Sequence, residues 1–394
     1  MNIQYASRMD GIKPSAIRSL NTNPEMIFFG GGYPDGDVFP FDAIKTAFDA
    51  AIVNSGREAL QYSFSVGLPK LRQQIADRMK QEHIHCTMDN VLILQGAQQG
   101  LDLVARLLID KGDVIITEAP TFLGALGAFA ACEPQYETVP VDDDGLDTDA
   151  LEALLMCQPR AKLLYTIPDY HNPTGVTMSL ERRKALIRLA NKYGLVILED
   201  SPYREVHFDA PPPVPLKSLD EEGRVIYLGS FSKILSPGLR LGWTVASEEI
   251  IHKLTLLKLG ADTQCSTLNM TAISNLLETY DLEKHIGTIR QYYRHKKDVM
   301  LDALRNELPQ GIRFTDPAGG LFTWLTFPDG FDARKFLIDC AIPKFEVGYV
   351  PGDPFYAKDP EINHARVSFS SVPLGNIEPG IARLGEALRN YAAG

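Results

Sequence analysis

The sequence lacks any long hydrophobic run. Nowhere in its 394 residues does a stretch approach the roughly 18 consecutive apolar residues of a membrane-spanning helix. The opening segment, from Met1 to Arg8, has no apolar core of the kind found in signal peptides. We therefore expect a protein with no membrane partner and a cytoplasmic location.

Cysteine is scarce as well. An odd, scattered set without a CxxC pair argues against both a disulfide framework and a zinc site, so we predict buried, reduced thiols. The close histidine pair His83 and His85 has no HExxH motif beside it. We predict that these histidines are exposed and that the protein holds no metal. The five cysteines are Cys86, Cys132, Cys157, Cys265 and Cys340.

Positive charge is in deficit. The chain has 39 Lys and Arg against 50 Asp and Glu, a net charge of -11 at pH 7. A chain with this balance lacks the broad basic surface that binds nucleic acid, although it leaves room for a local cationic pocket that binds a small anion. Hydrophobic residues make up 45% and charged residues 23% of the sequence. This is the composition of an ordinary folded protein rather than of a disordered or fibrous one.

Short β-rich runs alternate with longer helical patterns through the middle of the sequence. Such alternation predicts an α/β fold with a mostly parallel central sheet and helices on both faces. Apolar residues recur at three- and four-residue steps in the expected helices Gln98–Ile109, Leu180–Lys192 and Glu248–Lys258. The expected strands are Val91–Leu94, Val114–Thr117, Lys162–Ile167, Leu195–Glu199, Val225–Leu228 and Leu241–Ala246.

A second, smaller α+β domain is expected toward the C-terminus. A charged amphipathic helix is predicted from Glu283 to Leu308, followed by two short strand patterns at Phe322–Phe327 and Ala365–Ser370. The first roughly 40 residues, with Gly and Pro gathered near their end, are typical of an arm and an entrance loop. We therefore divide the chain into residues 1–45 (arm and entrance loop, part of the small domain), 46–285 (large domain) and 286–394 (small domain).

The most informative segment follows the apolar run Val225–Leu228. It places Lys233 near a strand end, where loss of solvation makes an amine nucleophilic. Ser230, Ser232 and Arg240 on either side of the lysine would form a cradle for an anion. The combination predicts imine chemistry beside a phosphate. For an isolated motif of this kind, the alternative is an exposed lysine among turn serines.

Two further segments place polar side chains directly after apolar strands. Asp200 and Tyr203 follow the strand at Leu195–Glu199, at the sheet edge where α/β proteins bind ligands. There they are placed to pair with a protonated ring nitrogen and a phenolic oxygen. Asn172, in an Asn-Pro-Thr-Gly sequence, follows Lys162–Ile167 and offers an amide donor. Taken singly, Asp200 is equally typical of a helix N-cap, and Asn-Pro-Thr-Gly of a plain turn.

A fourth segment, Gly96-Ala97-Gln98, follows the expected strand Val91–Leu94 and opens a helix. Backbone N–H groups at a helix start point toward any anion bound there. No complete G-x-G-x-x-G sequence follows a strand, which argues against a nicotinamide or flavin dinucleotide enzyme.

Taken together and in this order, the four segments resemble the fold-type-I pyridoxal-5′-phosphate (PLP) enzymes. Among these, the sequence is most similar to the class I/II aminotransferases and their 2-aminoadipate aminotransferase-like branch. The resemblance spans nearly the whole chain. It implies that Lys233 forms the imine link to PLP and moves the proton at Cα, that Asp200 binds the pyridine nitrogen, and that Asn172 and Tyr203 contact the ring oxygen, Asn172 next to the substrate. It also implies that Phe122 stacks on the ring and that the phosphate is held by Gly96, Ala97, Gln98, Ser230, Ser232 and Arg240.

The same resemblance implies substrate contacts and a homodimer. Arg366 matches the arginine that clamps the substrate α-carboxylate, a role that suits its planar guanidinium fork. Gly31 and Gly32 match glycines that line the substrate entrance. Arg18 resembles an N-terminal arginine that some adipate-type members use for a distal carboxylate, with a solvated surface arginine as the alternative. Tyr62 matches the tyrosine that reaches the phosphate of the neighbouring subunit, so the two subunits would share their sites.

Two positions depart from the family pattern. Phe122 stands where many relatives carry Tyr, which removes a hydroxyl near the ring, and Ala97 replaces a frequent Ser, which removes one side-chain donor to the phosphate. Backbone donors and Arg240 remain, and a charge-assisted contact contributes roughly 1.5–3 kcal/mol against about 1 for a neutral one. We expect cofactor binding to survive both changes.

The implied reaction moves the amino group of an L-amino acid to a 2-oxo acid, with 2-oxoglutarate as the expected acceptor. Arg18 favours an acidic side chain, whereas Tyr33, Phe64 and Phe122 would suit an aromatic or long aliphatic one. Substrates of the 2-aminoadipate, aromatic and branched types therefore all stay open. One rival reading is a β-lyase or decarboxylase on the same fold, because the cofactor residues do not choose which Cα bond breaks. Another is a non-catalytic amino-acid-sensing module, like those that follow a DNA-binding winged helix in certain regulators.

Overall fold

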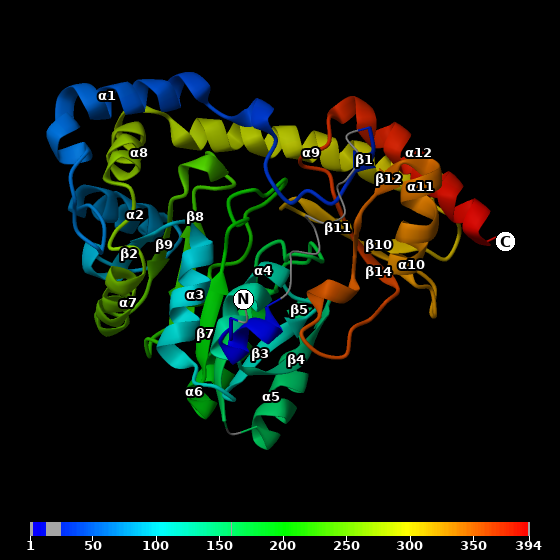
Figure 1. Ribbon diagram of the computed structural model, residues 1–394, viewed down its shortest axis with the longest axis horizontal. Coiled ribbons are helices and arrows are strands. Elements are labelled where there is room, and N and C mark those ends of the chain that lie inside the picture. The colour runs from blue at the N-terminus through cyan, green and yellow to red at the C-terminus, as the bar shows by residue number, and fades with distance from the viewer. Residues whose placement is uncertain (1–2, 13–24, 159, 393–394) are drawn as a thin grey trace.

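Among the described residues, the largest sheet has eight strands, in the order β2-β9-β8-β7-β6-β3-β4-β5. The computed structural model describes residues 3–12, 25–158 and 160–392 (Figure 1). The neighbours β8, β7, β6, β3 and β4 run parallel, while β9, β2 and β5 pair antiparallel with their neighbours. The strands are β2 (Val91–Leu94), β3 (Val114–Ala119), β4 (Gln135–Asp142), β5 (Gly145–Leu146), β6 (Ala161–Thr166), β7 (Val196–Asp200), β8 (Val225–Ser230) and β9 (Gly242–Val245).

Successive residues of the central strands face opposite helical layers. In β8, Val225 and Ile226 belong to different hydrophobic clusters, and in β7 the same is true of Ile197 and Leu198. Because helices cover both faces, these strands are continuous apolar runs rather than alternating ones, and the predicted α/β fold is confirmed. One layer contains α5 (Thr148–Cys157) and α6 (Leu180–Tyr193), and the other contains α3 (Ala97–Leu108), α4 (Leu123–Phe129) and α7 (Glu248–Ala261).

The ends of two helices show the capping signals that the sequence carries. Helix α6 begins after Ser179, whose hydroxyl accepts a hydrogen bond from the Arg182 N–H, and it ends at Gly194 in the left-handed conformation. Helix α3 begins after Gly96, which has φ of 74°. A side chain at this φ would be strained, so glycine permits the turn that carries part of the candidate site.

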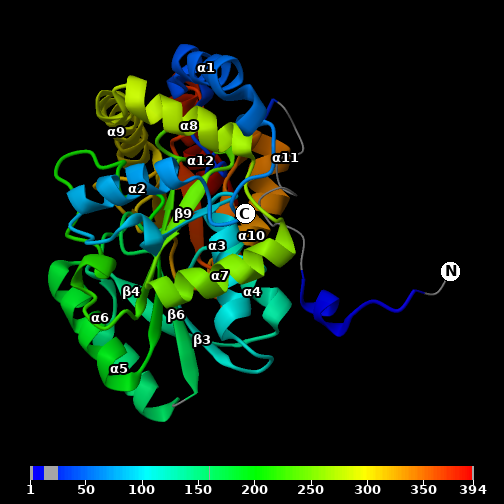
Figure 2. The same ribbon diagram turned by 90° about the vertical axis from the view of Figure 1, so that its left-hand side faces the viewer.

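A second unit joins the C-terminal third of the chain to its N-terminal segment (Figures 1 and 2). Helix α9 (Leu282–Glu307) packs on α12 (Leu374–Ala392). Strand β1 (Ile27–Phe28) pairs in parallel with β12 (Val347–Gly348). The antiparallel sheet of this unit contains β10 (Arg313–Phe314), β11 (Phe322–Thr326), β14 (His364–Ser368) and β13 (Val350–Pro351), in that order.

The expected domain limits after residues 45 and 285 fall inside α1 (Phe41–Ala59) and α9. Both helices therefore run across the division, which stays a proposal. Other helices in the described part of the chain are α2 (Pro69–Gln81), α8 (Thr267–Thr279), α10 (Ala333–Phe336) and α11 (Ile342–Phe345).

Most of the predicted elements lie where the sequence indicated. Strand β4 was not anticipated. Buried thiols are confirmed for Cys86, Cys265 and Cys340, whereas the prediction is wrong for Cys157, which is exposed, and for the half-buried Cys132. His83 and His85 are exposed, as expected. No helix in the described ranges is both long enough and apolar enough to cross a membrane.

Candidate active site

Lys233 lies just beyond the end of β8, and its amino group donates to the carbonyl of Gly32 at 2.9 Å. The ammonium also lies over the ring of Tyr203, 5.6 Å from the ring centre. Burial lowers the pKa of Lys233 to about 8, and the positive charges of Arg366 and Arg240 act in the same direction. The chain thus holds a lysine that is partly neutral near physiological pH, as a nucleophile or a general base requires.

Asp200 ends β7 with one carboxylate oxygen bonded and the other free. Oδ2 accepts a hydrogen bond from the hydroxyl of Tyr165 at 2.8 Å. Oδ1 is buried and has no hydrogen-bond partner among the described residues. Burial raises the pKa of Asp200 to about 6, while the Tyr165 hydroxyl and the Lys233 charge lower it. A buried oxygen of this kind calls for a donor that the chain itself does not supply.

Arg366 lies on β14 and joins three parts of the chain. Its Nη1 donates to Oδ1 of Asn172 at 2.8 Å, and its Nη2 donates to the carbonyl of Gly30 at 2.9 Å. The guanidinium carbon sits 4.3 Å from the ring centre of Phe322 and 5.0 Å from that of Phe355. Burial lowers the pKa of Arg366 to about 10. The result is a desolvated guanidinium with donors left over for an anion.

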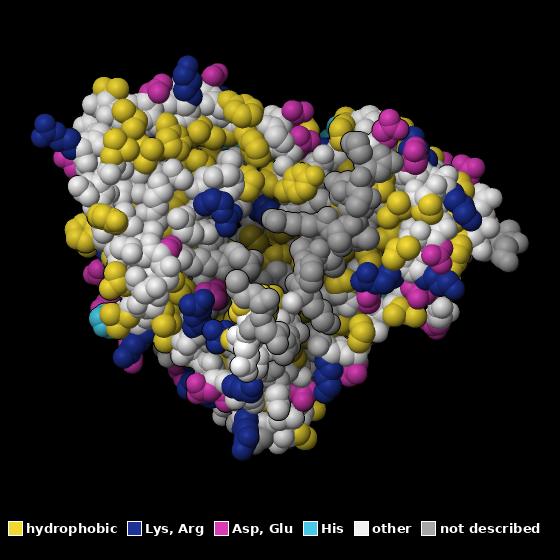
Figure 3. All heavy atoms as spheres, viewed as in Figure 1, with side chains coloured by type: hydrophobic (Ala, Val, Ile, Leu, Met, Phe, Trp, Pro, Cys, Tyr) yellow, Lys and Arg dark blue, Asp and Glu magenta, His cyan; other side chains and the backbone are white. Residues whose placement is uncertain are grey.

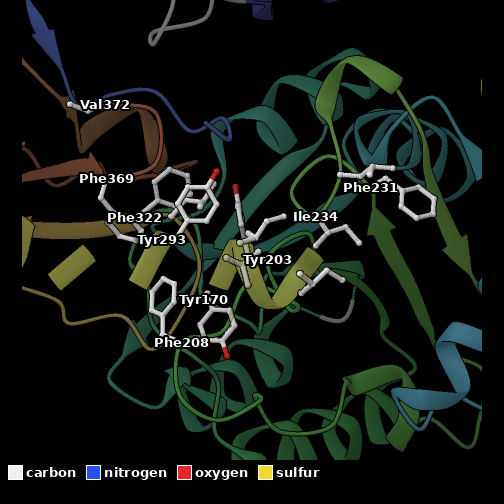
Figure 4. Packing of buried hydrophobic residues seen from close by; sticks show 14 of the residues in the cluster. Tyr170, Tyr203, Phe208, Phe231, Ile234, Tyr293, Phe322, Phe369 and Val372 are labelled. Atoms are coloured by element: carbon white, nitrogen blue, oxygen red, sulfur yellow. The ribbon is translucent and has the colours of Figure 1, made fainter. Parts of the chain in front are cut away.

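Asn172 and Tyr203 complete the space between these charges. The amide nitrogen of Asn172 donates to the hydroxyl of Tyr203 at 3.3 Å. The Tyr203 ring meets Phe322 edge to face, with ring centres 5.6 Å apart (Figure 4). Burial raises the pKa of Tyr203 well above its ordinary value, so the phenol stays protonated and can donate a hydrogen bond.

A cradle for an anion forms around the start of α3. Arg240 donates from Nη2 to the carbonyl of Gln95 at 3.0 Å. A Cβ on Gly96 would lie 2.6 Å from that same nitrogen, so a side chain there would displace the Arg240 guanidinium. The Ser230 hydroxyl lies 2.9 Å from that of Ser232. The first N–H groups of α3, from Ala97 and Gln98, have no acceptor within the helix itself.

The remaining predicted residues lie in different surroundings. Phe122 caps the start of α4, and its ring covers Gly124. Gly31 and Gly32 line the entrance loop, where a Cβ on Gly32 would lie 3.0 Å from Phe322 and 3.5 Å from Arg366. Tyr62 is 81% exposed. Arg18 falls outside the described residues.

Three side chains that contact the candidate site residues were not predicted from the sequence. The sequence predicts Tyr165 as part of an apolar strand, and its hydroxyl, which needs a hydrogen-bond partner when buried, is the signal that could have marked it. The rings of Phe322 and Phe355 pack against the Arg366 guanidinium, but no sequence motif links them to it. No group of acidic, histidine or cysteine side chains in the described parts of the chain suits a metal ion.

Comparison with known proteins gives a consistent answer. The sequence profile of the family described as Aminotransferase class I and II matches residues 24–384. The chain is 39% identical to aromatic-amino-acid aminotransferase 1 of Thermococcus litoralis, over 98% of this chain and 94% of that protein.

Two solved structures share its fold at high similarity. One is a kynurenine aminotransferase of Pyrococcus horikoshii in complex with PMP, with a TM-score of 0.94, 37% identity, and 98% and 97% of the two chains covered. The other is LysN, the alpha-aminoadipate aminotransferase of Thermus thermophilus, complexed with N-(5′-phosphopyridoxyl)-L-leucine. Its TM-score is 0.92, with 36% identity and 99% and 98% covered.

Proposed function

Because the chain belongs to the class I and II aminotransferases, we propose that it moves the amino group of an L-amino acid of the aromatic, 2-aminoadipate or branched type to 2-oxoglutarate. That it is a PLP-dependent aminotransferase follows from its family and its relatives. The substrates and the roles given below to individual residues are our proposal.

The observation that carries the proposal is the unpartnered Oδ1 of Asp200. A carboxylate oxygen buried at the end of β7 fits the protonated nitrogen of the PLP ring, and Lys233 fits the cofactor aldehyde. Tyr203 and Asn172 would hold the ring oxygen, Phe122 would cover the ring face, and Gly96, Ala97, Gln98, Ser230, Ser232 and Arg240 would hold the phosphate. When bound, the cofactor supplies a ring that withdraws electrons from the substrate's α-carbon.

Asp200 would keep the ring nitrogen protonated. Its position is fixed by the hydroxyl of Tyr165 on Oδ2, which leaves Oδ1 directed to the ligand. Ion pairing with a ring N–H would favour the charged carboxylate and offset the burial that raises its pKa. The ring would then stay cationic, as electron withdrawal requires.

Lys233 would move the proton at the substrate's α-carbon. With a pKa of about 8, roughly a quarter of the amine is neutral at pH 7.5, against about one part in a thousand for an ordinary lysine. A partly neutral amine can both accept and return a proton. Its hydrogen bond to the carbonyl of Gly32 holds the amine at the entrance loop, near the substrate.

Arg366 would bind the substrate's α-carboxylate. A guanidinium has five N–H donors, and Asn172 and Gly30 accept one each. Nε has no partner in the described part of the chain. The flanking Phe322 and Phe355 rings exclude water and so strengthen the attraction for a carboxylate. Gly31 and Gly32 would leave room for the substrate beside it.

The substrate side chain would lie toward aromatic residues. Tyr33 follows the entrance glycines and Phe64 lies between α1 and α2, and both are exposed, while Phe122 is half-buried. The leucine adduct named for LysN and the aromatic substrates named for the T. litoralis protein support a broad range of side chains. Arg18 stays proposed for a distal carboxylate.

A second copy of the chain would complete the site. Large apolar side chains that lie together on α1 and the loop after it are more exposed than is usual for a monomer, and Figure 3 shows them gathered over α1. We propose that they form a homodimer interface in which Tyr62 reaches the partner's phosphate site. The exposed residues are Phe41, Ile52, Val53, Leu60, Tyr62 and Phe64.

The test of the proposed function is Lys233→Ala, with Lys253→Ala as the control on exposed helix surface. We expect Lys233→Ala to lose both turnover and the visible absorbance of bound cofactor, and Lys253→Ala to keep both. A coloured, active Lys233→Ala enzyme would refute the assignment. Transfer of one amino group to one 2-oxoglutarate supports the proposal, whereas ammonia or carbon dioxide release would favour the β-lyase or decarboxylase reading.

A further inference from the structure

Lys258 is a buried cation that the mechanism above does not use. It lies on the last turns of α7 with 0% of its side chain exposed. Its amino group donates to both carboxylate oxygens of Asp262, at 2.8 and 2.7 Å, and to Oε1 of Gln99 at 3.0 Å. The three N–H donors of the ammonium thus all have acceptors. A lysine is seldom fully buried unless it is paired in this way.

Gln99 connects the lysine to the turn that opens α3. Its Oε1 also accepts from the backbone N–H of Gln95 at 2.9 Å, and its Nε2 donates to Oδ2 of Asp262 at 2.7 Å. The carbonyl of the same residue, Gln95, accepts from Arg240. Both backbone polar groups of Gln95 are therefore hydrogen-bonded: the carbonyl accepts from Arg240, and the N–H donates to Gln99.

The far side of this arrangement is also anchored. The N–H of Gln264 donates to the carbonyl of Asp262 at 2.7 Å, and its side-chain oxygen accepts from the N–H of Ser63. The backbone of Asp262 is therefore held in place by Gln264, so the carboxylate of Asp262 stays beside Gln99 if Lys258 is replaced. Helices α3 and α7 lie side by side in Figure 2. The hydrogen bond from Lys258 on α7 to Gln99 on α3 therefore joins the end of α7 to the start of α3.

We propose that Lys258 is a positioning residue for the phosphate of the cofactor, acting through Gln99 on the turn of Gln95 and Gly96. The proposal rests on the function proposed above. Without the ammonium, the Gln99 amide loses one of its three hydrogen bonds, and the carboxylate of Asp262 loses its cationic partner while it still faces Gln99. The turn then no longer holds Arg240 and the first N–H groups of α3 in the geometry that an anion needs.

The experiment compares two ligands that differ only in the phosphate. Cofactor-free Lys258→Met, Gln99→Met and the exposed control Lys253→Met are titrated with PLP and with pyridoxal, and binding is followed by visible absorption. Each loss of a charge-assisted contact corresponds to about a tenfold to hundredfold weaker affinity. We expect both test variants to bind PLP that much more weakly while pyridoxal binds as in the parent protein.

Each other outcome has a defined meaning. An equal loss for PLP and pyridoxal would show a general structural role and overturn the proposal, as would unchanged PLP affinity in Gln99→Met. Gln99→Met leaves the Lys258–Asp262 ion pair in place. If Lys258→Met does not fold, the PLP affinity of Gln99→Met therefore tests the proposal. A parent protein that binds neither ligand would refute the proposed function itself. A parent protein that binds PLP, with variants that bind PLP equally well, would refute only the role proposed for Lys258.

Discussion

The buried Asp200 should make the cofactor-free protein less stable than it would be with a neutral side chain. Burial raises the pKa of this carboxyl from 3.8 to about 6. The folded state therefore keeps the proton to a higher pH than the unfolded state does. The contribution of Asp200 to stability is therefore most favourable below pH 3.8 and falls as the pH rises to about 6, beyond which it is constant.

The size of the effect follows from the shift. About two pKa units at about 1.4 kcal/mol each give a total cost near 3 kcal/mol, of which about 2 kcal/mol develops between pH 4.5 and pH 8. Asp200→Asn removes the ionisation and can still accept the hydrogen bond from Tyr165. Relative to the parent, cofactor-free Asp200→Asn should therefore gain about 2 kcal/mol of unfolding free energy over that pH range, and it should lose activity.

The assay is urea unfolding of both cofactor-free proteins at several pH values from 4.5 to 8. Comparing the difference at two pH values removes any constant packing cost of the amide. Asp143→Asn, at an exposed position, is the control and should show no such trend. A flat difference for Asp200→Asn, or one that falls as the pH rises, would refute the view that Asp200 is held in a desolvated site.

Two further predictions concern neighbours of this carboxylate and the carboxylate-binding arginine. Tyr165→Phe removes the donor to Asp200 and should raise the pKa of Asp200 by about one to two units. The fall in PLP affinity at low pH should therefore begin at a correspondingly higher pH. An unchanged midpoint of PLP affinity against pH would contradict the role given to Tyr165. Arg366→Lys loses the planar fork that serves Asn172, Gly30 and a carboxylate together, so KM for the amino acid should rise about tenfold to hundredfold with a smaller change in kcat. Equal KM values in steady-state assays of the parent and Arg366→Lys would exclude that clamp.

The parts that could be predicted from the sequence share one physical cause. Strands buried on both faces are continuous apolar runs, and in a parallel sheet the residues that follow them meet at one edge. Asp200 at the end of β7, Asn172 after β6 and Lys233 after β8 could therefore be placed near one another from the sequence alone. Strand β4 escaped because only Val139 in it is fully buried and a proline interrupts its pattern.

The parts that could not be predicted depend on contacts between distant segments. Phe355 reaches Arg366 because β13 and β14 pair across a loop, and the carbonyl of Gly30 comes from the other end of the chain. The hydroxyl of Tyr165 needs a partner once it is buried, but the sequence alone does not show that this partner is Asp200 on the neighbouring strand. Lys258 is the last residue of the expected helix Glu248–Lys258, and only the packing of α7 on α3 shows that it is buried.

The most direct test of the account is a visible absorption spectrum of the purified protein, titrated first with single amino acids and then with 2-oxoglutarate. We predict that an absorption band of bound cofactor is lost on addition of an aromatic, branched or 2-aminoadipate-type amino acid and returns when 2-oxoglutarate is added. The most effective amino acid would name the substrate class. A band that no amino acid removes, or that 2-oxoglutarate does not restore, would contradict transamination between these substrates, and a protein that binds no PLP would contradict the role given to Lys233.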